Sequence, residues 1–498
     1  MRPDRRSIFF GGTALAVVFA CGPSAPIVPP ANTHGLAVTT RAFHDHSWMS
    51  FVALSRPGLA RAGAFGEFER GRVDAARALK YGGKPVWLTW KQDFELWPRA
   101  VPRDSFNRKR VSAPTEWASY ALAAGEDGVC VGVDPRTLQL SGKIEQSFAH
   151  HPVFAQNGQA LRYSVHINQP YYETVVQNKW YQGRSLVTDP RHQFPPASRG
   201  RPEHGATVIK AAWIVLTPEQ AADRALRARF YVEEAQIAPA GIESVMGPVQ
   251  CAPASVALVG LHIMQKTAAR PSWFWSSFEH KEVAPFGVET QPATPWLLAQ
   301  SGAPATVPPK LEAGAVTAVP TPVGQRAINK QKFLKSMLAR NDDYQTMLAG
   351  TVWANYRLVG TQWPSRVLFR KGKQDLLDGI GEDPAKFDRI VRRRAGRSVP
   401  ANHVTNMTME AYFLEPDPRQ QDLGSSCMQC HYRASHWDYS YVLEFQGFAN
   451  QGVPDPPGLP AEPAEPVVPV APVVPAVPAA PPEPVPSPEP ATSPAPTL

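Results

Sequence analysis

The sequence predicts an α+β protein whose body is rich in β-strands. Five runs of aromatic and β-branched residues, each bounded by Gly, Pro or charged residues, have the pattern of short strands. These runs lie at 84–90, 206–217, 227–237, 255–267 and 271–280. Helices are expected at 41–54, 170–180 and 323–349. Hydrophobic residues make up 43% of the chain, which is enough to bury a substantial core between these elements.

The predicted elements divide the body into two parts. The strands dominate 36–285, and we expect this range to form a β-rich lobe. Residues 286–322 are rich in Pro, Ala and Gly, a composition typical of a linker or a long loop. Residues 323–452 combine a predicted helix with a cysteine motif, so a second, mixed lobe is expected there.

The first 21 residues (1–21) have the pattern of an export signal. Basic residues at 2–6 precede an apolar run at 8–20, which is too short for a stable membrane span. The run ends in a small residue followed by Cys21, as in the lipobox of bacterial lipoproteins, so lipidation of Cys21 is expected. An ordinary secretory peptide is the alternative. Either signal predicts an exported, periplasmic protein, and a lipid on Cys21 would anchor it to the membrane.

Proline-rich segments follow this signal and end the chain. Residues 22–35 have the composition of an extended tether. Residues 453–498 have Pro at short intervals and contain no aromatic residue, so they cannot build a packed core. We expect this tail to be disordered or polyproline-like.

Cys427, Cys430 and His431 form a Cys-x-x-Cys-His motif near the end of the body. Two thiols three residues apart lie on one side of a helical turn, where both can bond the vinyl groups of one haem. The adjacent histidine then reaches the iron from one face. A thioredoxin-like redox pair would not need His431, and a zinc site would need further ligands nearby. The motif predicts one haem c with Cys427 and Cys430 as thioether sites and His431 as an axial ligand.

The remaining cysteines suit an exported protein. The chain has five cysteines, and Cys130 and Cys251 remain once the lipidation site and the haem motif are assigned. An oxidising periplasm permits a disulfide between these two residues. Two buried thiols are the alternative, because the sequence does not show whether the two Cα atoms approach closely enough to be bridged.

The position of the motif restricts the sixth ligand of the iron. Met428 is the last methionine and lies inside the motif. His436 is too close to His431 to reach the opposite face of the same haem. Residues upstream of the motif must therefore supply the sixth ligand, or the position is open.

Met409 and His262 are the best upstream candidates for this ligand. Met409 lies in 401–413, which we expect to form a helix before the haem segment. His262 lies in the predicted strand 255–267, where it shares a face with Met264. His403, Met407, Met264 and His280 complete the set. A methionine or histidine ligand indicates an electron carrier, and an open position indicates a site for a small molecule.

Two histidine pairs lie outside this group, His44 with His46 and His150 with His151. Neither pair has a carboxylate or a third histidine at metal-ligand spacing. We therefore expect these histidines on the surface or in loops.

The net charge of +8 leaves the choice of partner open. A basic body can steer acidic partners or anionic headgroups. The sequence shows no dense stripe of Lys and Arg, and we expect no nucleic-acid partner.

Seven segments in fixed order resemble a known group of proteins. They lie at 47–57, 156–181, 209–216, 257–280, 352–364, 404–412 and 425–441. Together they resemble large exported bacterial monohaem proteins described as cytochrome c family proteins. The resemblance covers 43–448 and implies Cys427 and Cys430 as thioether sites and His431 as an iron ligand. It implies no substrate.

The expected function is electron transfer by an exported monohaem c-type cytochrome with redox partner proteins in the periplasm. A haem enzyme with an open sixth position is the alternative, such as an oxidase, a peroxidase or a small-molecule reductase. A haem-based sensor is a further possibility. Because the motif is C-terminal, we expect the haem segment to dock against the body, with residues before 425 forming the far wall of the pocket.

Overall fold

The computed structural model describes most of the body and several residues of the C-terminal segment. The described residues are 40–64, 66–97, 99–100, 113–122, 126–142, 144–146, 151–155, 159–181, 192–198, 205–239, 249–267, 270–283, 298, 331–368, 397–400, 406–409, 427, 431 and 438–443. The chain divides into two units, Met1–Asp455 and Pro456–Leu498, and every described residue belongs to the first. Cys21, the tether and the tail lie outside the described residues.

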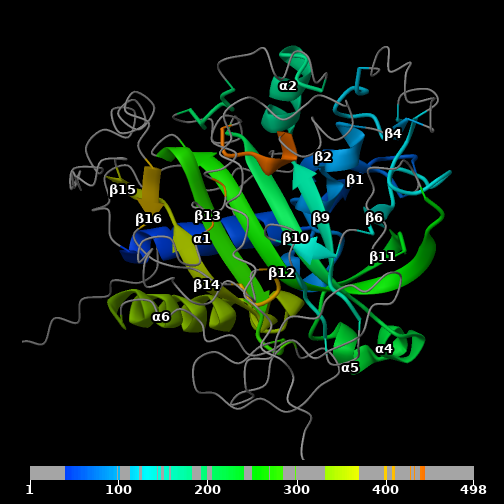
Figure 1. The fold of residues 1–498 in the computed structure, drawn as a ribbon. Helices are drawn as coiled ribbons and strands as arrows, with labels where there is room; N and C mark the ends of the chain where they lie inside the picture. Colours follow the sequence, from blue (N-terminus) through cyan, green and yellow to red (C-terminus); the bar gives the residue numbers. More distant parts are fainter. Residues whose placement is uncertain are drawn as a thin grey trace, which may run out of the picture. The chain divides into compact units, whose positions relative to one another are not determined.

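A mixed sheet of eight strands forms the centre of the body. Its main path follows the order β14-β13-β12-β10-β9-β3, with antiparallel neighbours throughout (Figure 1). These strands are β14 (Tyr356–Gln362), β13 (Arg270–His280), β12 (Ala252–Thr267), β10 (Thr207–Val215), β9 (Arg162–Ile167) and β3 (Lys91–Gln92). β11 (Val232–Ile237) also pairs with β12, and β6 (Leu138–Leu140) runs parallel to β11. The predicted α+β class is therefore confirmed.

Helices and short strand pairs surround this sheet. The helices are α1 (Thr40–Ser55), α2 (Gln169–Gln177), α4 (Pro218–Ala222), α5 (Arg224–Arg227) and α6 (Gln331–Met347). The two-stranded pairs are β1 (Gly58–Ala60) with β2 (Phe68–Val73), β4 (Arg99–Ala100) with β5 (Glu126–Asp127), β7 (Glu145–Gln146) with β8 (His151–Pro152), and β15 (Pro364–Leu368) with β16 (Arg397–Pro400). Short 3₁₀ helices lie at η2 (Leu79–Tyr81), η3 (Val86–Thr89), η4 (Asp93–Glu95) and η7 (Val352–Asn355).

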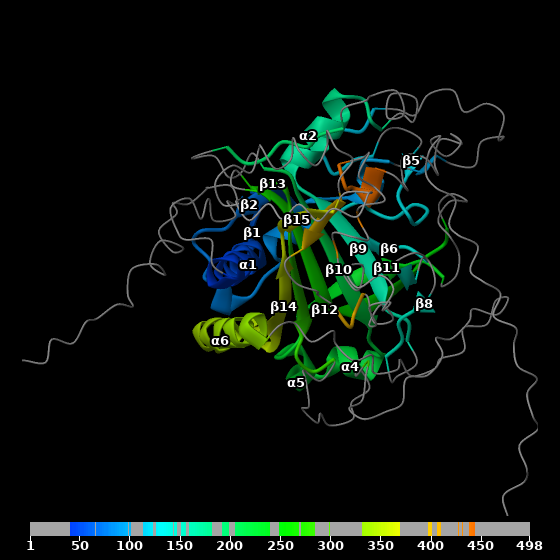
Figure 2. The same ribbon diagram turned by 60° about the vertical axis from the view of Figure 1, so that its left-hand side comes forward.

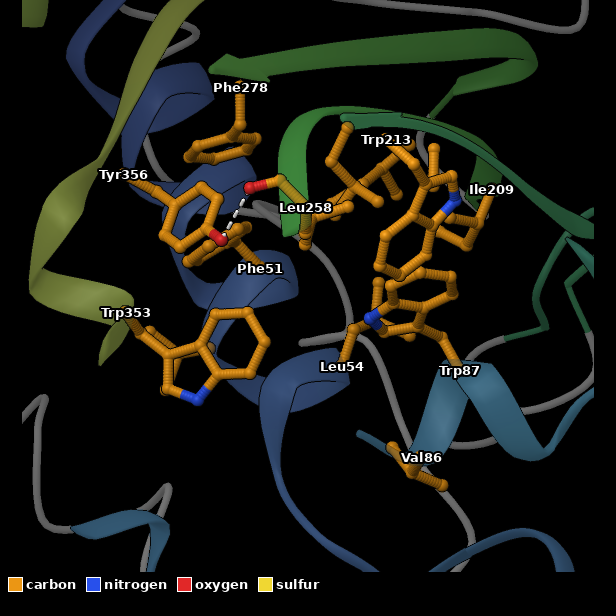
Figure 3. Packing of buried hydrophobic residues seen from close by; sticks show 14 of the residues in the cluster. Phe51, Leu54, Val86, Trp87, Ile209, Trp213, Leu258, Phe278, Trp353 and Tyr356 are labelled. Atoms are coloured by element: carbon orange, nitrogen blue, oxygen red, sulfur yellow. Dashed lines mark hydrogen bonds between the residues drawn. The ribbon is translucent and has the colours of Figure 1, made fainter. Parts of the chain in front are cut away.

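One face of the sheet packs against α1 and α6, which lie side by side (Figure 2). Phe51 of α1 stacks on Phe278 of β13 with ring centroids 4.4 Å apart. The hydroxyl of Tyr356 donates to the carbonyl oxygen of Leu258 at 2.8 Å, within the same apolar cluster (Figure 3). We call this the helix-covered face, and it buries Leu258, Leu261 and Ile263 of β12.

The opposite face of β12 points toward the C-terminal segment. Side chains alternate along a strand, and a bulge in the pairing of β10 with β12 turns Gly260, His262, Met264 and Lys266 to this face. A Cβ atom at Gly260 would lie 1.8 Å from the hydroxyl oxygen of Thr408. A glycine is therefore required there, because the 406–409 turn rests directly on the strand.

The pattern of strands departs from the prediction at 84–90. Residues Val86–Thr89 form a 3₁₀ helix, and only Lys91–Gln92 pair with the sheet. Pro85 precedes the helix, and the hydroxyl of Thr89 donates to the carbonyl oxygen of Val86 at 2.6 Å. Trp87 is completely buried, so the apolar run signals burial in a turn and not a strand.

The predicted separation into two lobes also differs from the structure. β14 comes from the range 323–452 and pairs with β13 from the range 36–285. The two ranges therefore share one sheet, since pairing between distant strands leaves no mark on local composition. The predicted strand 227–237 begins later, at Val232, because α5 ends at Arg227.

A disulfide joins Cys130 to Cys251 with an S–S distance of 2.09 Å. Two backbone hydrogen bonds align the partners: the N–H of Val131 donates to Val249, and the N–H of Val249 donates to Val129. The bridge spans 121 residues of sequence. It ties the segment before β12 to the segment before β6.

His44 and His46 lie in α1 and are buried, so the expectation of surface or loop positions is wrong for this pair. The ring of His46 hydrogen-bonds Gln265 of β12 at 3.1 Å, and the ring of His44 hydrogen-bonds Ser336 of α6 at 3.3 Å. α1 packs against both the sheet and α6, so its two histidines have partners on different elements. His150 lies outside the described residues.

Four buried histidines should make the protein sensitive to acid. Burial is the main cause that lowers the pKa from 6.5 to about 4 for His44 and His46, and to about 3 for His166 and His280. Between pH 6.5 and 4 the unfolded chain binds protons that the folded protein does not bind. The free energy of unfolding should therefore fall as the pH falls through this window.

Urea unfolding at several pH values between 7 and 4 measures this dependence. Replacing His166 with Gln should reduce the slope of the free energy of unfolding against pH by about one proton. An unchanged slope in His166→Gln would contradict the assignment of that histidine as a buried neutral group.

Candidate haem site

Cys427 and His431 both have helical backbone conformation. Residues four apart lie on the same side of a helix, so both side chains point the same way. Cys427 is half-buried and packs against a cluster that includes Trp180, Met264 and Trp273. The predicted thioether site is thus placed on the opposite face of the sheet. Cys430 lies outside the described residues, as do Met428 and His436.

The imidazole of His431 is held in one tautomer. Its Nδ1 donates to the carbonyl oxygen of Tyr439 at 2.7 Å, so the proton lies on Nδ1 and the lone pair on Nε2. The pKa of His431 is lowered to about 4, chiefly by burial; the bond to Tyr439 opposes this shift, and the charge of Lys210 adds to it. A neutral imidazole whose second nitrogen is bonded to a carbonyl is the usual form of a metal ligand.

Aromatic rings enclose this imidazole. The ring of Trp275 lies edge-on to it with centroids 6.1 Å apart, and the ring of Tyr441 lies 4.9 Å away. Trp275 comes from β13 and Tyr441 from the C-terminal segment. The candidate ligand is therefore shielded from water on two sides by groups of low polarity.

His262 lies within electrostatic range of His431. Burial lowers its pKa well below 6.5, and electrostatic interactions with Lys210 and His431 act in the same direction. Lys210 of β10 is the direct register partner of His262 on β12. The C-terminal histidine is therefore placed over the central strands of the sheet, beside a candidate for the sixth ligand.

Met409 occupies a different cluster. Its side chain is buried with Met407 against Leu161, Ala212 and Val259 of the sheet, whereas Cys427 packs in the cluster of Met264. His280 lies edge-on to Tyr356 of the helix-covered face, stacks on Phe230 and hydrogen-bonds a backbone carbonyl. His262 interacts electrostatically with His431, and Met264 packs in the same cluster as Cys427. His403 lies outside the described residues.

The predicted helix at 401–413 is a turn where the structure describes it, at 406–409. The side-chain oxygen of Asn406 accepts from the N–H of Thr408 at 2.9 Å. The side-chain nitrogen of Asn406 donates to the carbonyl oxygen of Phe278 at 2.7 Å. These hydrogen bonds compete with the helical pattern. In the turn that results, Met407 and Met409 are both buried.

Trp275 offers the site a polar group suited to a cofactor. The indole N–H of Trp275 is buried, and it has no hydrogen-bond partner among the described residues. A buried donor of this kind is costly unless a further group accepts from it. A haem carries carboxylate oxygens that can accept, so the residues of the site fit the group that the motif predicts.

Several site residues have weak sequence signals. Lys210 and Lys266 are the charged residues inside otherwise apolar strand runs, and this break in the pattern could have marked them. Asp438 pairs with Lys266, and Tyr439 contacts His431 through its carbonyl oxygen. Neither residue has such a signal, because both contacts depend on a backbone turn. The carbonyl oxygen that orients His431 belongs to the main chain and cannot be recognised from residue type.

The comparisons with known proteins give no family for this fold and site. No protein-family model, no curated protein and no solved structure matches the chain. The resemblance to cytochrome c family proteins stays a prediction that rests on the sequence segments.

The described residues lack two further features. They contain no cluster of three His, Cys, Asp or Glu side chains that could hold a metal ion. In the same part of the chain, no helix is both long and apolar enough to cross a membrane.

Proposed function

We propose that the protein is an exported monohaem c-type cytochrome that transfers electrons. Cys427 and Cys430 form the thioether bonds in this proposal, and His431 is the axial ligand. The observation that carries it is the neutral imidazole of His431, with its proton on Nδ1 held by the carbonyl of Tyr439. A bound haem would supply a one-electron couple between Fe(III) and Fe(II).

The body contributes shielding and charge to this function. Trp273 and Trp275 of β13 and Tyr171 of α2 exclude water from the side of the haem segment. When groups of low polarity surround a redox centre, its surroundings rearrange little on electron transfer. The same groups also influence the reduction potential of the centre. No side chain needs to gain or lose a proton in this process, since His431 is neutral and Nδ1 keeps its proton.

A spectrum of the purified holoprotein tests the proposal. We expect covalent haem that survives denaturation, and low-spin reduced bands that do not change with carbon monoxide. Cys430→Ala should lose one thioether bond, whereas the double variant Cys130→Ser/Cys251→Ser should retain both. A protein without covalent haem would contradict the proposal, and a high-spin form that binds carbon monoxide would favour the haem-enzyme alternative.

His262 is the proposed sixth ligand, because it shares a face of β12 with Met264, which packs in the cluster of Cys427, while Met409 is buried in another cluster. His262→Ala should convert the reduced haem to a five-coordinate, high-spin form that binds carbon monoxide. Met409→Leu and Met264→Leu should keep the low-spin spectrum. The reverse result, with Met409→Leu opening the site, would return the assignment to Met409.

Lys210 should raise the reduction potential of the site. Its positive charge acts on both His431 and His262, and a nearby cation favours the reduced iron. Lys210→Gln should therefore lower the midpoint potential by tens of millivolts, on the order expected for one partly screened charge. Redox titration measures this shift. Lys84→Gln removes a charge that pairs with Glu233 and should leave the potential unchanged.

Export and lipidation belong to the same proposal. Cys21 is the proposed lipid site, the periplasm is the proposed location, and periplasmic redox proteins are the proposed partners. Metabolic labelling with a fatty acid should label the wild-type protein and not Cys21→Ser. Equal labelling of both proteins would remove Cys21 as the anchor.

A further inference from the structure

The segment that receives His431 adopts a strained backbone. Asp438 has a φ of 51° and Tyr439 a φ of 63°, two successive left-handed residues without a glycine. Residues other than glycine rarely adopt this conformation, and it persists only where the surroundings hold it. The surroundings of this turn therefore indicate what the fold keeps in place.

Asp438 is fixed by the sheet. Its carboxylate forms an ion pair with Lys266 of β12, and both side chains are almost fully buried. The same carboxylate accepts from the backbone N–H of Phe194 at 2.8 Å. The backbone carbonyl of Asp438 accepts from the indole N–H of Trp273 at 2.6 Å. Three groups from distant parts of the sequence thus hold one residue.

Lys266 is itself oriented by the body. Its ammonium donates to the carbonyl oxygen of Phe194 at 3.1 Å and lies 5.3 Å from the centroid of the Trp273 ring. An ion pair at such low exposure is maintained only when additional hydrogen bonds satisfy both partners. These bonds are present for Lys266 and for Asp438.

The next two residues of the turn face different partners. The carbonyl oxygen of Tyr439 accepts from Nδ1 of His431 at 2.7 Å. The hydroxyl of Ser440 hydrogen-bonds the hydroxyl of Tyr171 of α2 at 2.6 Å. The carbonyl that sets the tautomer of His431 is therefore flanked on both sides by residues bound to the body.

We propose that the Lys266–Asp438 ion pair is a positioning device for His431, which acts by aiming the carbonyl of Tyr439 at Nδ1. This inference rests on the proposed function and adds to it a link from the central sheet to the axial ligand. Lys266 and Asp438 touch neither the iron nor its porphyrin in this account. They act through the backbone of the turn, with Tyr171 as a second support.

The midpoint potential of the holoprotein tests the proposal. A hydrogen bond from Nδ1 to a carbonyl makes the imidazole a stronger electron donor and favours Fe(III). Loosening the turn weakens that bond, so Asp438→Asn, Lys266→Met and Tyr171→Phe should all raise the potential. Lys266→Arg keeps the charge and should bring the potential back toward that of the wild-type protein.

The three variants separate positioning from simple electrostatics. Loss of the Asp438 charge alone would raise the potential, loss of the Lys266 charge alone would lower it, and Tyr171→Phe changes no charge. Shifts of opposite sign with no effect in Tyr171→Phe would overturn the proposal, and so would no shift at all. If Lys266→Met does not fold, Asp438→Asn and Tyr171→Phe decide the question.

A matched control uses another buried ion pair of the same sheet. Glu279 of β13 pairs with Arg357 of β14 at 2.8 Å, with both side chains almost fully buried. The second carboxylate oxygen of Glu279 accepts from the backbone N–H of Met407, not from the haem segment. Glu279→Gln should leave the potential unchanged. A wild-type protein without haem would contradict the proposed function, whereas haem with unchanged potentials would contradict the positioning proposal alone.

Discussion

Replacing His431 with Ala is expected to abolish the low-spin haem spectrum and to lower the haem content of the purified protein. Residues that only support a metal ligand already change metal affinity by about 10- to 100-fold. Loss of the ligand itself should therefore weaken coordination of the iron by at least about tenfold. The intensity of the low-spin bands per covalently bound haem, measured by absorption after purification, gives the size of the effect.

His280 provides a matched control for this variant. It is also a buried, neutral histidine, its ring hydrogen-bonds the carbonyl oxygen of Arg229 at 3.1 Å, and its pKa is about 3. It lies on the helix-covered face, so His280→Ala should lower stability and leave the haem spectrum of the folded protein intact. A wild-type spectrum in His431→Ala would contradict the assignment of the axial ligand.

His280 is a useful control because the two histidines differ in the hydrogen bonding of their second ring nitrogen. The other ring nitrogen of His280 accepts from the N–H of Glu282 at 3.2 Å, so both nitrogens are bonded within the protein. Nδ1 of His431 is bonded to Tyr439, and the lone pair of Nε2 can serve a metal. The chemical difference between a structural histidine and a ligand is thus a difference in hydrogen bonding.

Much of the central sheet could be predicted from local pattern. The predicted strand 255–267 corresponds to β12, and the predicted helix 41–54 corresponds to α1. Long apolar strands and helices keep their periodicity wherever they are placed in the fold. β14 is different: a glycine interrupts its short sequence, and its identity as a strand depends on pairing with β13.

The candidate site likewise contains some residues that the sequence indicates and others that it does not. Cys427 and His431 belong to a local motif and could be named from sequence. Lys266 and Asp438 are 172 residues apart, and their ion pair depends on a docked segment. Residue type alone does not indicate such a contact. The bulge near Gly260 decides which face His262 occupies, and a bulge has no reliable sequence signature.

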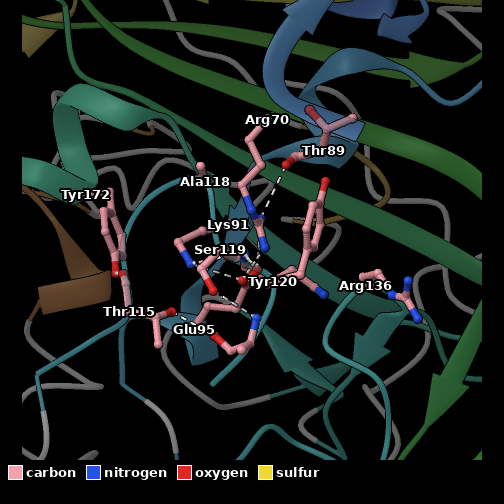
Figure 4. Close-up of polar contacts among 12 residues, drawn as sticks. Arg70, Thr89, Lys91, Glu95, Thr115, Ala118, Ser119, Tyr120, Arg136 and Tyr172 are labelled. Atoms are coloured by element: carbon pink, nitrogen blue, oxygen red, sulfur yellow. Dashed lines mark hydrogen bonds and ion pairs between the residues drawn. The ribbon is translucent and has the colours of Figure 1, made fainter. Parts of the chain in front are cut away.

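A second group of buried charges allows a prediction about stability. Arg70 donates two hydrogen bonds to the carboxylate of Glu95 at 3.2 and 2.5 Å (Figure 4). Lys91 lies 3.4 Å from the same carboxylate and donates to the carbonyl oxygen of Ser119 at 3.0 Å. All three charged side chains are almost fully buried. One carboxylate therefore balances two buried cations.

Glu95→Gln should lower the free energy of unfolding by about 3–5 kcal/mol, since it leaves both cations without their counter-charge in a region of low polarity. Urea or guanidinium unfolding measures the loss. The control is Glu67→Gln, which breaks the more exposed ion pairs with Arg61 and Arg136 and should cost less than about 1 kcal/mol. Similar losses in the two variants would contradict the assigned role of the buried network.

The pH dependence of the stability loss in Glu95→Gln identifies the part of that loss that is due to Lys91. Burial lowers the pKa of Lys91 from 10.5 to about 8, and Glu95 opposes this shift. Between pH 8 and 10.5 the unfolded chain holds a proton that the folded protein lacks, so the stability of the wild-type protein should rise with pH in this window. Above pH 8 Lys91 is neutral and no longer attracts Glu95. The cost of Glu95→Gln should therefore be smaller at pH 9 than at pH 6, and the remaining cost at pH 9 belongs to Arg70.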